Sequence, residues 1–320
     1  MTQPVLRLDH LSKTYGRGPR AVRALHDFDL TVEPGQVFAF LGPNGAGKTT
    51  TMHLALDYIR PTAGRATIFG LPSSDPRARE RLGFLPELFN FDLFLTGVET
   101  LRYYARLSGL TGADVAQRAD RWLRRLGLWD ARDRRLSTYS KGMMQRVGLA
   151  QALVGDPELV MLDEPTSGMD PVGKREVLDL FRELRQEGRT VFLSSHILSD
   201  IEAVADHVAL IHEGTLRYCG PLGDMLQGDD FVLVRFAAPP DADVPGQAAG
   251  AVLQDGTWQV EVEGDERRRE LLARIQAAGW DIAAVVPRRR ALDDAFLDLL
   301  KPDGDAQDAP PAADRSRGRS

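Results

Sequence analysis

The stretch Gly42-Pro43-Asn44-Gly45-Ala46-Gly47-Lys48-Thr49 decides the fold of this 320-residue chain. It fits the phosphate-binding pattern G-x-x-x-x-G-K-[ST], in which glycines let backbone N–H groups curl around phosphate oxygens. The apolar run Gln36–Leu41 before it indicates a buried parallel strand, and Thr49–Ile59 after it indicates a helix. This order predicts a phosphate site in which Lys48 neutralises charge and the Thr49 hydroxyl binds Mg²⁺.

A second apolar run, Leu159–Leu162, ends in the acidic pair Asp163 and Glu164. A buried strand would deliver both carboxylates to its C-terminal tip, where Asp163 would reach the magnesium through water. Glu164 would polarise the attacking water as general base. Such a pair is commonplace by itself, and it gains meaning from the loop at 42–49.

Strands and helices alternate along the first two thirds of the chain, which indicates an α/β fold around a parallel sheet. Two early segments, Val5–Leu8 and Asp27–Val32, alternate apolar and polar residues as half-buried strands do. Helical spacing over 98–127 predicts a helical subdomain near 88–150. Further strands are expected at Glu158–Leu162, Thr190–Ser194 and Val208–His212, with a helix at 173–187.

The pattern restarts after Pro221–Asp230, which we expect to be a linker. Strands are predicted at Phe231–Phe236, Trp258–Val262 and Asp281–Val286, and helices at Glu266–Ala278 and Leu292–Leu300. We therefore expect a nucleotide-binding domain at 1–222 and a small α+β accessory domain at 223–302. Residues 303–320, rich in Pro, Ala, Asp and Arg, are expected to be a disordered tail.

Composition narrows the class of protein. No stretch approaches about 18 consecutive apolar residues, and the N-terminus lacks the pattern of a secretory signal. The single cysteine, Cys219, fits a reducing cytoplasm. Residues 1–222 hold 28 Lys+Arg and 27 Asp+Glu, which leaves 12 and 19 of the chain's 40 and 46 for residues 223–320. This C-terminal acidity argues against a nucleic-acid-binding module there.

Four further features, together with the loop and the acidic pair, resemble the ATP-binding-cassette (ABC) ATPases. Tyr139–Arg146 resembles the signature motif of that family, and Ser167–Asp170 resembles its D-loop. His196 resembles the switch histidine, and Tyr15 resembles the aromatic residue that stacks on adenine. The resemblance covers residues 4 to about 222. It implies a P-loop NTPase fold with a parallel-sheet core, an N-terminal antiparallel β layer and a helical subdomain.

The resemblance also implies a role for each candidate residue. Glu164 and His196 would be catalytic, with His196 bound to the γ-phosphate. The magnesium ligands would be Thr49, Asp163 and Glu87. ATP would contact Tyr15, Gly42, Pro43, Asn44, Gly45, Ala46, Gly47, Lys48, Thr49, Thr50, Glu87, Ser140, Gly142 and Asp170.

Ser140 and the Gly142 amide precede a helix and form an anion site without a lysine of the P-loop kind. Such a site is useful against the γ-phosphate of another molecule. In the family, two cassettes sandwich two ATP molecules, so we expect a second ATP-binding subunit and a homodimer with two-fold symmetry.

Two departures from the family pattern point to one of its branches. Glu87 stands where glutamine is usual, so this residue can reach Mg²⁺ through water but cannot donate a hydrogen bond. Lys141 and Met143 replace the common glycine and glutamine. Both changes are typical of the drug- and antibiotic-exporter branch, whose small C-terminal domain ends in a helix like Ala291–Leu300. We therefore expect a separate transmembrane permease as partner, a place at the cytoplasmic face of the cell membrane and no nucleic-acid partner.

Other functions compete with this interpretation. A cassette protein acting on ribosomes or DNA would usually carry two cassettes, coiled-coil inserts or zinc cysteines. An importer ATPase would more often have glutamine at position 87 and a β-barrel regulatory domain. A P-loop kinase does not explain residues 139–146.

Two surface features have alternative interpretations. Residues 84–104 gather the aromatic side chains Phe84, Phe89, Phe91, Phe94, Tyr103 and Tyr104. They would be the core of the helical subdomain, or some would line a groove for a permease helix. The seven arginines of 118–135 would form a solvated helix face or contact anionic lipid head groups.

Overall fold

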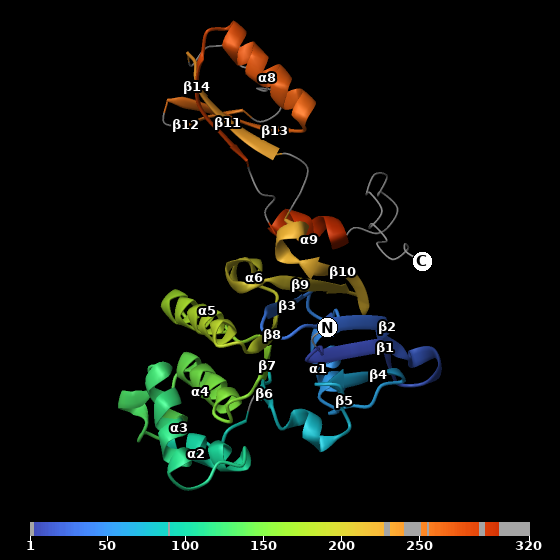
Figure 1. Ribbon diagram of the computed structural model, residues 1–320, viewed down its shortest axis with the longest axis vertical. Helices are drawn as coiled ribbons and strands as arrows, with labels where there is room; N and C mark the ends of the chain where they lie inside the picture. The colour runs from blue at the N-terminus through green and yellow to red at the C-terminus, as the bar shows by residue number, and fades with distance from the viewer. Residues whose placement is uncertain are drawn as a thin grey trace, which may run out of the picture.

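A computed structural model of the chain describes residues 3–88, 90–226, 231–239, 251–254, 256–287 and 292–300. Three sheets organise this described part (Figure 1). The element order confirms the expected α/β class. None of the helices within these ranges is long and apolar enough to cross a membrane.

The central sheet has the strand order β10-β9-β3-β8-β7-β6. Its strands are β3 (Val37–Leu41), β6 (Leu82–Leu85), β7 (Leu159–Asp163), β8 (Thr190–Ser195), β9 (His207–His212) and β10 (Thr215–Pro221). All neighbours are parallel except β10, which runs antiparallel to β9. This is the parallel core that the alternating pattern predicted.

Both faces of the central sheet are buried, which explains its continuous apolar strands. In β3, Val37, Ala39 and Leu41 pack in one apolar cluster. Phe38 and Phe40 pack in the cluster on the opposite face. The Phe38 ring stacks on Phe192 of β8 with centroids 5.6 Å apart. Burial of each such side chain contributes about 1.5–3 kcal/mol.

Different layers cover the two faces (Figure 1). The first face is covered by α4 (Lys141–Leu153), α5 (Pro171–Gln186) and α6 (Leu198–Val204). The second face is covered by α1 (Lys48–Ala55) and the antiparallel sheet. Helix α1 ends four residues before the predicted Ile59, because Asp57 adopts the left-handed φ of 60°.

The antiparallel layer has the order β2-β1-β4-β5. Its strands are β1 (Leu6–Tyr15), β2 (Val22–Val32), β4 (Ala63–Ile68) and β5 (Leu71–Pro72). The expected N-terminal β layer is therefore confirmed. Short 3-10 helices lie at Gly18–Arg20, Pro76–Arg79, Trp129–Ala131 and Leu136–Thr138.

The helical subdomain contains α2 (Gly97–Leu107) and α3 (Gly112–Arg125). Helix α2 begins with a reciprocal capping box between Thr96 and Glu99. The arginines of the region bind neighbouring groups: Arg118 pairs with Asp156, Arg125 with Glu183, and Arg124 and Arg132 lie over the Trp129 ring. These contacts favour the interpretation as a paired helix face over a free basic patch.

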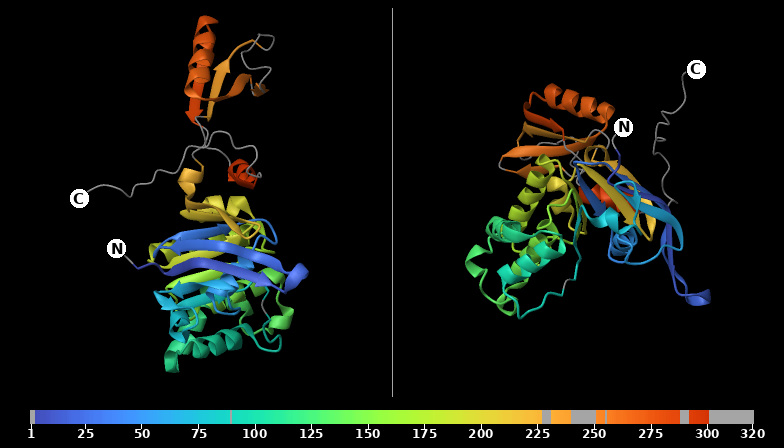
Figure 2. Two further views of the ribbon diagram at one scale, coloured as in Figure 1. Left: turned by 90° about the vertical axis from the view of Figure 1, so that its right-hand side faces the viewer. Right: turned by 60° about the horizontal axis from the view of Figure 1, so that its bottom comes forward.

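The small C-terminal unit is a four-stranded antiparallel sheet of order β12-β13-β11-β14 with one helix. Its elements are β11 (Phe231–Ala237), β12 (Val252–Gln254), β13 (Thr257–Glu263), α8 (Asp265–Ala277) and β14 (Asp281–Pro287). Val234 and Phe236 pack with Ile275 of α8 in a separate apolar cluster. The left view of Figure 2 shows the sheet and α8 apart from the central sheet.

Two predictions for this region were wrong. The expected linker at Pro221–Asp230 begins with a helix, α7 (Leu222–Met225), because Leu222, Met225 and Leu226 are spaced to bury one face in the cluster of the central sheet. The last helix, α9 (Leu292–Leu300), was expected to pack within the accessory domain. It contacts α6 and β10, and its Leu292 and Ala295 are buried in the central cluster.

The predicted tail at 303–320 lies outside the described residues.

Candidate functional site

The candidate residues of the phosphate loop, Glu87, the acidic pair and His196 meet at the carboxyl ends of four neighbouring parallel strands. The phosphate loop follows β3, His196 follows β8, Asp163 ends β7, and Glu87 follows β6. Ligands of open α/β sheets bind at this edge. The side chains surround a cavity of about 330 Å³. It is lined by Ala24, Asn44, Gly45, Gly47, Lys48, Thr49, Thr50, Glu87, Asp163, Glu164, Ser167 and His196.

Backbone crowding around the loop requires glycine at two positions. Gly47 has a φ of 113°, and a Cβ there would lie 2.8 Å from the Ala24 carbonyl oxygen. A Cβ on Gly42 would lie 2.4 Å from the Ile211 carbonyl oxygen. The turn after β9 also supports the loop, since the Gly214 N–H donates to the Ala46 carbonyl at 2.9 Å. The sequence patterns did not identify this support from Gly214.

Lys48 is folded back on its own loop. Its Nζ donates to the carbonyl oxygens of Gly42 at 2.7 Å and Pro43 at 3.3 Å. Burial lowers the pKa of Lys48, while the Glu164, Asp163 and Glu87 carboxylates act in the opposite direction. A cation with little water around it binds phosphate oxygens strongly.

Asp163 and Thr49 form a cluster of oxygen ligands. The Thr49 hydroxyl donates to Asp163 Oδ2 at 2.9 Å, and the Ser194 hydroxyl donates to Asp163 Oδ1. Asp163 is only 1% exposed. Hydroxyl and carboxylate oxygens are the ligands that Mg²⁺ prefers, so these residues fit the cation.

Glu164 faces His196 across the cavity. The two side chains approach to 2.9 Å between Glu164 Oε1 and His196 Nδ1. Within the described residues, the second oxygen, Glu164 Oε2, is buried without a hydrogen-bond partner. A buried acceptor without a partner is costly, so this atom is suited to bind a water molecule. The Glu164 backbone has the left-handed φ of 51°, which costs a non-glycine residue about 1–3 kcal/mol.

Ser140, Gly142 and Asp170 lie in a separate cavity of about 280 Å³. Ser140 caps α4 by accepting from the Met143 N–H, and Asp170 caps α5 by accepting from the Gly173 N–H. Two helix N-termini therefore border this cavity, which favours an anion. The Lys141 side chain crosses Gly168, since a Cβ built there would lie 2.5 Å from Lys141 Cε.

Tyr15 is not brought into either cavity. It lies at the end of β1 with 42% of its surface exposed, and Lys13 Nζ lies 5.1 Å from its ring centroid. Gly42, Pro43 and Ala46 belong to the phosphate loop without lining the cavity.

The predicted aromatic cluster divides between core and surface. Phe91 is 9% exposed and Phe94 79% exposed, and Phe89 lies outside the described residues. Phe84, Phe91 and Tyr104 line a groove of about 600 Å³ together with the exposed Leu88.

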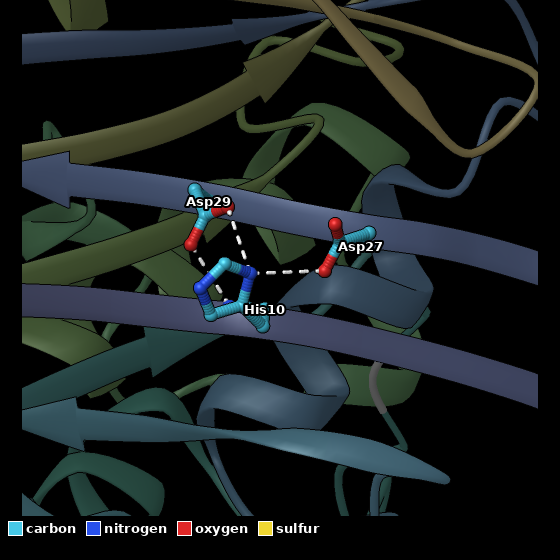
Figure 3. Close-up of side chains that lie close together, drawn as sticks. All are labelled: His10, Asp27 and Asp29. Carbon is cyan, nitrogen blue, oxygen red and sulfur yellow. Dashed lines mark hydrogen bonds and ion pairs between the residues drawn. The ribbon is translucent and has the colours of Figure 1, made fainter.

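A further cluster with metal-ligand chemistry lies on the outer β layer, where His10 contacts Asp27 and Asp29 (Figure 3). His10 Nδ1 lies 3.0 Å from Asp27 Oδ1 and 3.5 Å from Asp29 Oδ2. The hydrogen bond to Asp27 and the charge of Asp29 raise the pKa of His10. All three side chains are exposed and already paired, so we interpret the cluster as an ion pair between β1 and β2.

The fold and the main cavity together define a P-loop ATPase. A phosphate loop between β3 and α1 faces a buried Asp-Glu pair at the end of β7, and a separate anion site lies at the N-terminus of α4. This is the arrangement of a nucleotide-hydrolysing domain rather than of a dinucleotide-binding or kinase domain.

Comparison with known proteins identifies the family. The family model described as ABC transporter matches residues 25–167. An uncharacterized ABC transporter ATP-binding protein of Synechocystis is 34% identical and matches over 92% of this chain and 84% of its own length. The daunorubicin/doxorubicin resistance ATP-binding protein of Streptomyces peucetius is 33% identical over 99% of both chains. A solved ATP-binding subunit of an ABC transporter has 30% identity and a TM-score of 0.64, covering 69% of this chain and 91% of its own.

The chain therefore belongs to the ATP-binding proteins of ABC transporters. It is an ATP-hydrolysing subunit of an ABC transporter, as the sequence motifs predicted. Subunits of this class are membrane-associated, dimerise and work with transmembrane permeases.

Proposed function

We propose that this chain drives export through a separate permease, with Glu164 as the general base and His196 as the switch residue. The observation that carries the proposal is the buried Glu164 Oε2, which has no hydrogen-bond partner among the described residues and lies beside the His196 contact, in the same cavity as Lys48. A carboxylate in this position has an oxygen free for water and a partner that holds the other oxygen.

Each residue then has a defined action in ATP hydrolysis. Loop amides from Gly42 to Thr50 surround the phosphates, and Lys48 exchanges its loop carbonyls for phosphate oxygens. Glu164 accepts a proton from water as the water oxygen attacks the γ-phosphorus and the bond to the ADP oxygen breaks. His196 donates to a γ-phosphate oxygen. Tyr15 stacks on the adenine once β1 and the nucleotide come together.

Mg²⁺ fits the same cavity. Thr49 and Asp163 would hold it, with Glu87 reaching it through water. When bound, the cation neutralises charge that develops on the phosphate oxygens. The protein's contribution is to orient these oxygen ligands, as the bond between Thr49 and Asp163 already does.

The anion site at Ser140, Gly142 and Asp170 completes the site of a second copy. One subunit supplies the P-loop cavity, and its partner supplies the two helix N-termini, in a reciprocal two-fold dimer. ATP closes this homodimer and hydrolysis opens it.

The groove beside Phe84 and Tyr104 is our proposed contact with the permease. Its lining combines aromatic side chains with polar ones such as Arg79 and Gln151. The exposed Leu88 lies next to Glu87, so a permease helix seated there would sense the nucleotide cavity. We propose that residues 1–222 form the motor domain at the cytoplasmic face of the membrane. Residues 223–302 would form the accessory domain, with α7 and α9 packed on the motor. The resistance function of the Streptomyces relative supports an exporter.

The test of the proposal is Glu164→Gln, with Glu202→Gln as the matched control at an exposed position of α6. Removal of the base should lower kcat by about 10²–10⁴-fold while ATP still binds. The variant should also form an ATP-dependent dimer in size-exclusion chromatography. Near-normal hydrolysis by Glu164→Gln would refute the assignment of the base.

A further inference from the structure

The backbone of Glu164 is held in a conformation that its own side chain disfavours. Its φ of 51° lies in the left-handed region, and such residues persist only where neighbouring groups fix them. The Ser194 hydroxyl accepts from the Glu164 N–H at 3.1 Å, and two helices supply further groups to the segment Glu164–Thr166. The two helices differ in whether they begin at Ser140 of the anion site.

The first contact comes from Gln145 on α4. Its Nε2 donates to the Pro165 carbonyl at 3.0 Å and to the Glu164 carbonyl at 3.4 Å. Gln145 is 4% exposed, so these bonds replace water for a buried amide. The same helix begins at Ser140, whose hydroxyl caps it.

The second contact comes from α6. The Thr166 hydroxyl donates to Asp200 Oδ2 at 2.7 Å, and both side chains are buried. Lys174 Nζ lies 3.6 Å from the same carboxylate oxygen. This contact fixes the segment directly to α6, which carries no residue of the anion site. Lys174 lies on α5, whose N-cap Asp170 borders that site, so only the Thr166–Asp200 bond itself serves as the comparison.

We propose that Gln145 is a positioning residue for Glu164, through which α4 transmits occupation of the Ser140–Gly142 anion site to the general base. This inference rests on the proposed two-subunit site. A γ-phosphate bound at the N-terminus of α4 pulls on a rigid helix, and Gln145 lies less than two turns from that end. The pull reaches the carbonyls of Glu164 and Pro165 and moves Glu164 Oε2 relative to the attacking water. Each subunit's base thereby responds to the nucleotide held by its partner.

The test compares Gln145→Met with Thr166→Val in the full-length protein. Gln145→Met keeps the side-chain length and removes both donors, and Gln186→Met is the matched change at an exposed position of α5. ATP hydrolysis is measured against ATP concentration, ATP binding by a fluorescent analogue, and folding by thermal unfolding. If Gln145→Met does not fold, Gln145→Asn, which keeps the amide on a shorter stem, takes its place.

Gln145→Met should bind ATP like the wild type and lower kcat by about 10²-fold, the usual cost of a misplacement near 1 Å. Its Hill coefficient for ATP should fall to 1 from a wild-type value above 1. Thr166→Val should lower kcat and keep the wild-type Hill coefficient, since its direct partner Asp200 lies on α6, which carries no residue of the anion site. Gln186→Met should change neither quantity.

Two results would overturn the link. The first is that Gln145→Met keeps the wild-type Hill coefficient for ATP. The second is that Thr166→Val loses cooperativity as fully as Gln145→Met does. The dimerisation assay of Glu164→Gln distinguishes a failure of the Gln145 link from a failure of the proposed two-subunit site. If that variant forms no ATP-dependent dimer, the shared site and the signal derived from it are both refuted. If the dimer forms and Gln145→Met keeps its cooperativity, the link alone is refuted.

Discussion

Leu292→Ala should destabilise the nucleotide-binding part of the chain, although residue 292 follows the small sheet in sequence. The Leu292 side chain is 0% exposed and belongs to the same apolar cluster as Ile201 and Val204 of α6. Truncation of a buried leucine costs about 2–5 kcal/mol, and about 3 kcal/mol lowers the Tm of a 150–250-residue domain by about 6–12 °C. The loss cannot exceed the free energy that holds α9 on α6 and β10, because the helix can detach as a unit.

Differential scanning calorimetry with and without ATP measures this effect. Bound ATP raises the Tm of the part that binds it, which identifies the transition of the central sheet. Leu292→Ala should lower this ATP-sensitive Tm. The control on the same helix is Leu297→Ala, at a position 59% exposed, which should shift it by less than about 1–2 °C. Ile275→Ala, in the cluster of α8, should lower only the ATP-insensitive transition. The reasoning would be refuted if Leu292→Ala also shifted only that transition.

Three further changes test other parts of the site. Ser140→Arg should leave ATP binding to the monomer intact and abolish hydrolysis, since the bulky side chain obstructs only the opposing phosphate; loss of monomer binding would contradict this. His10 should titrate in NMR above the ordinary value of 6.5, and Asp27→Asn should lower its pKa. The stabilising contribution of this pair is then complete below pH 6.5 and is lost as pH rises through the raised pKa. An unchanged pKa in Asp27→Asn would exclude the pairing. Glu87→Gln should strengthen ATP binding in the presence of EDTA, because the cavity loses one negative charge. The ratio of the ATP affinity measured with Mg²⁺ to the ATP affinity measured in EDTA should therefore become smaller. An unchanged ratio would place Glu87 outside the charge balance of the cavity.

The sequence predicted the carboxyl edge of the central sheet well, for a physical reason. Strands such as Val37–Leu41 are buried on both faces, so their apolar runs are continuous and end abruptly where the chain reaches the cavity. Parallel strands also end at one edge, so residues far apart in sequence, such as Lys48 and Asp163, were expected together. The sequence alone therefore predicts that the polar residues at these strand ends lie close together.

The contacts of α7 and α9 could not be predicted in the same way. Pro221 and Gly223 are typical of a loop, yet Leu222, Met225 and Leu226 find an apolar surface that only the folded sheet provides. An amphipathic helix such as α9 specifies that one of its faces is buried, but not against which surface. The helix itself could therefore be predicted from the sequence, but the surface on which it packs could not.

Gln145 and the φ of Glu164 belong to a third class, which local pattern does not report at all. A glutamine near the start of a helix is ordinary, and its two bonds to Glu164 and Pro165 depend on how α4 packs beside β7. Buried side-chain bonds of this kind arise from tertiary structure, so they are found only once the helix and the strand are both placed.

The two departures from the family pattern compensate each other in the two-subunit site that we propose. Among the described residues, Glu87 adds a third carboxylate to a cavity whose lining otherwise holds the carboxylates of Asp163 and Glu164 and the ammonium group of Lys48. That excess of negative charge opposes the phosphates of ATP. Lys141 adds a positive charge beside the anion site that the partner would bring to the same phosphates. Charges interact strongly where water is excluded. Closing the dimer would therefore place the positive charge of Lys141 of one subunit close to the phosphates in the Glu87 cavity of the other, where it would offset the excess negative charge. Dimer closure would thus be favoured by the nucleotide more than in a cassette with the usual glutamine and glycine, and a single open subunit would hold ATP less tightly.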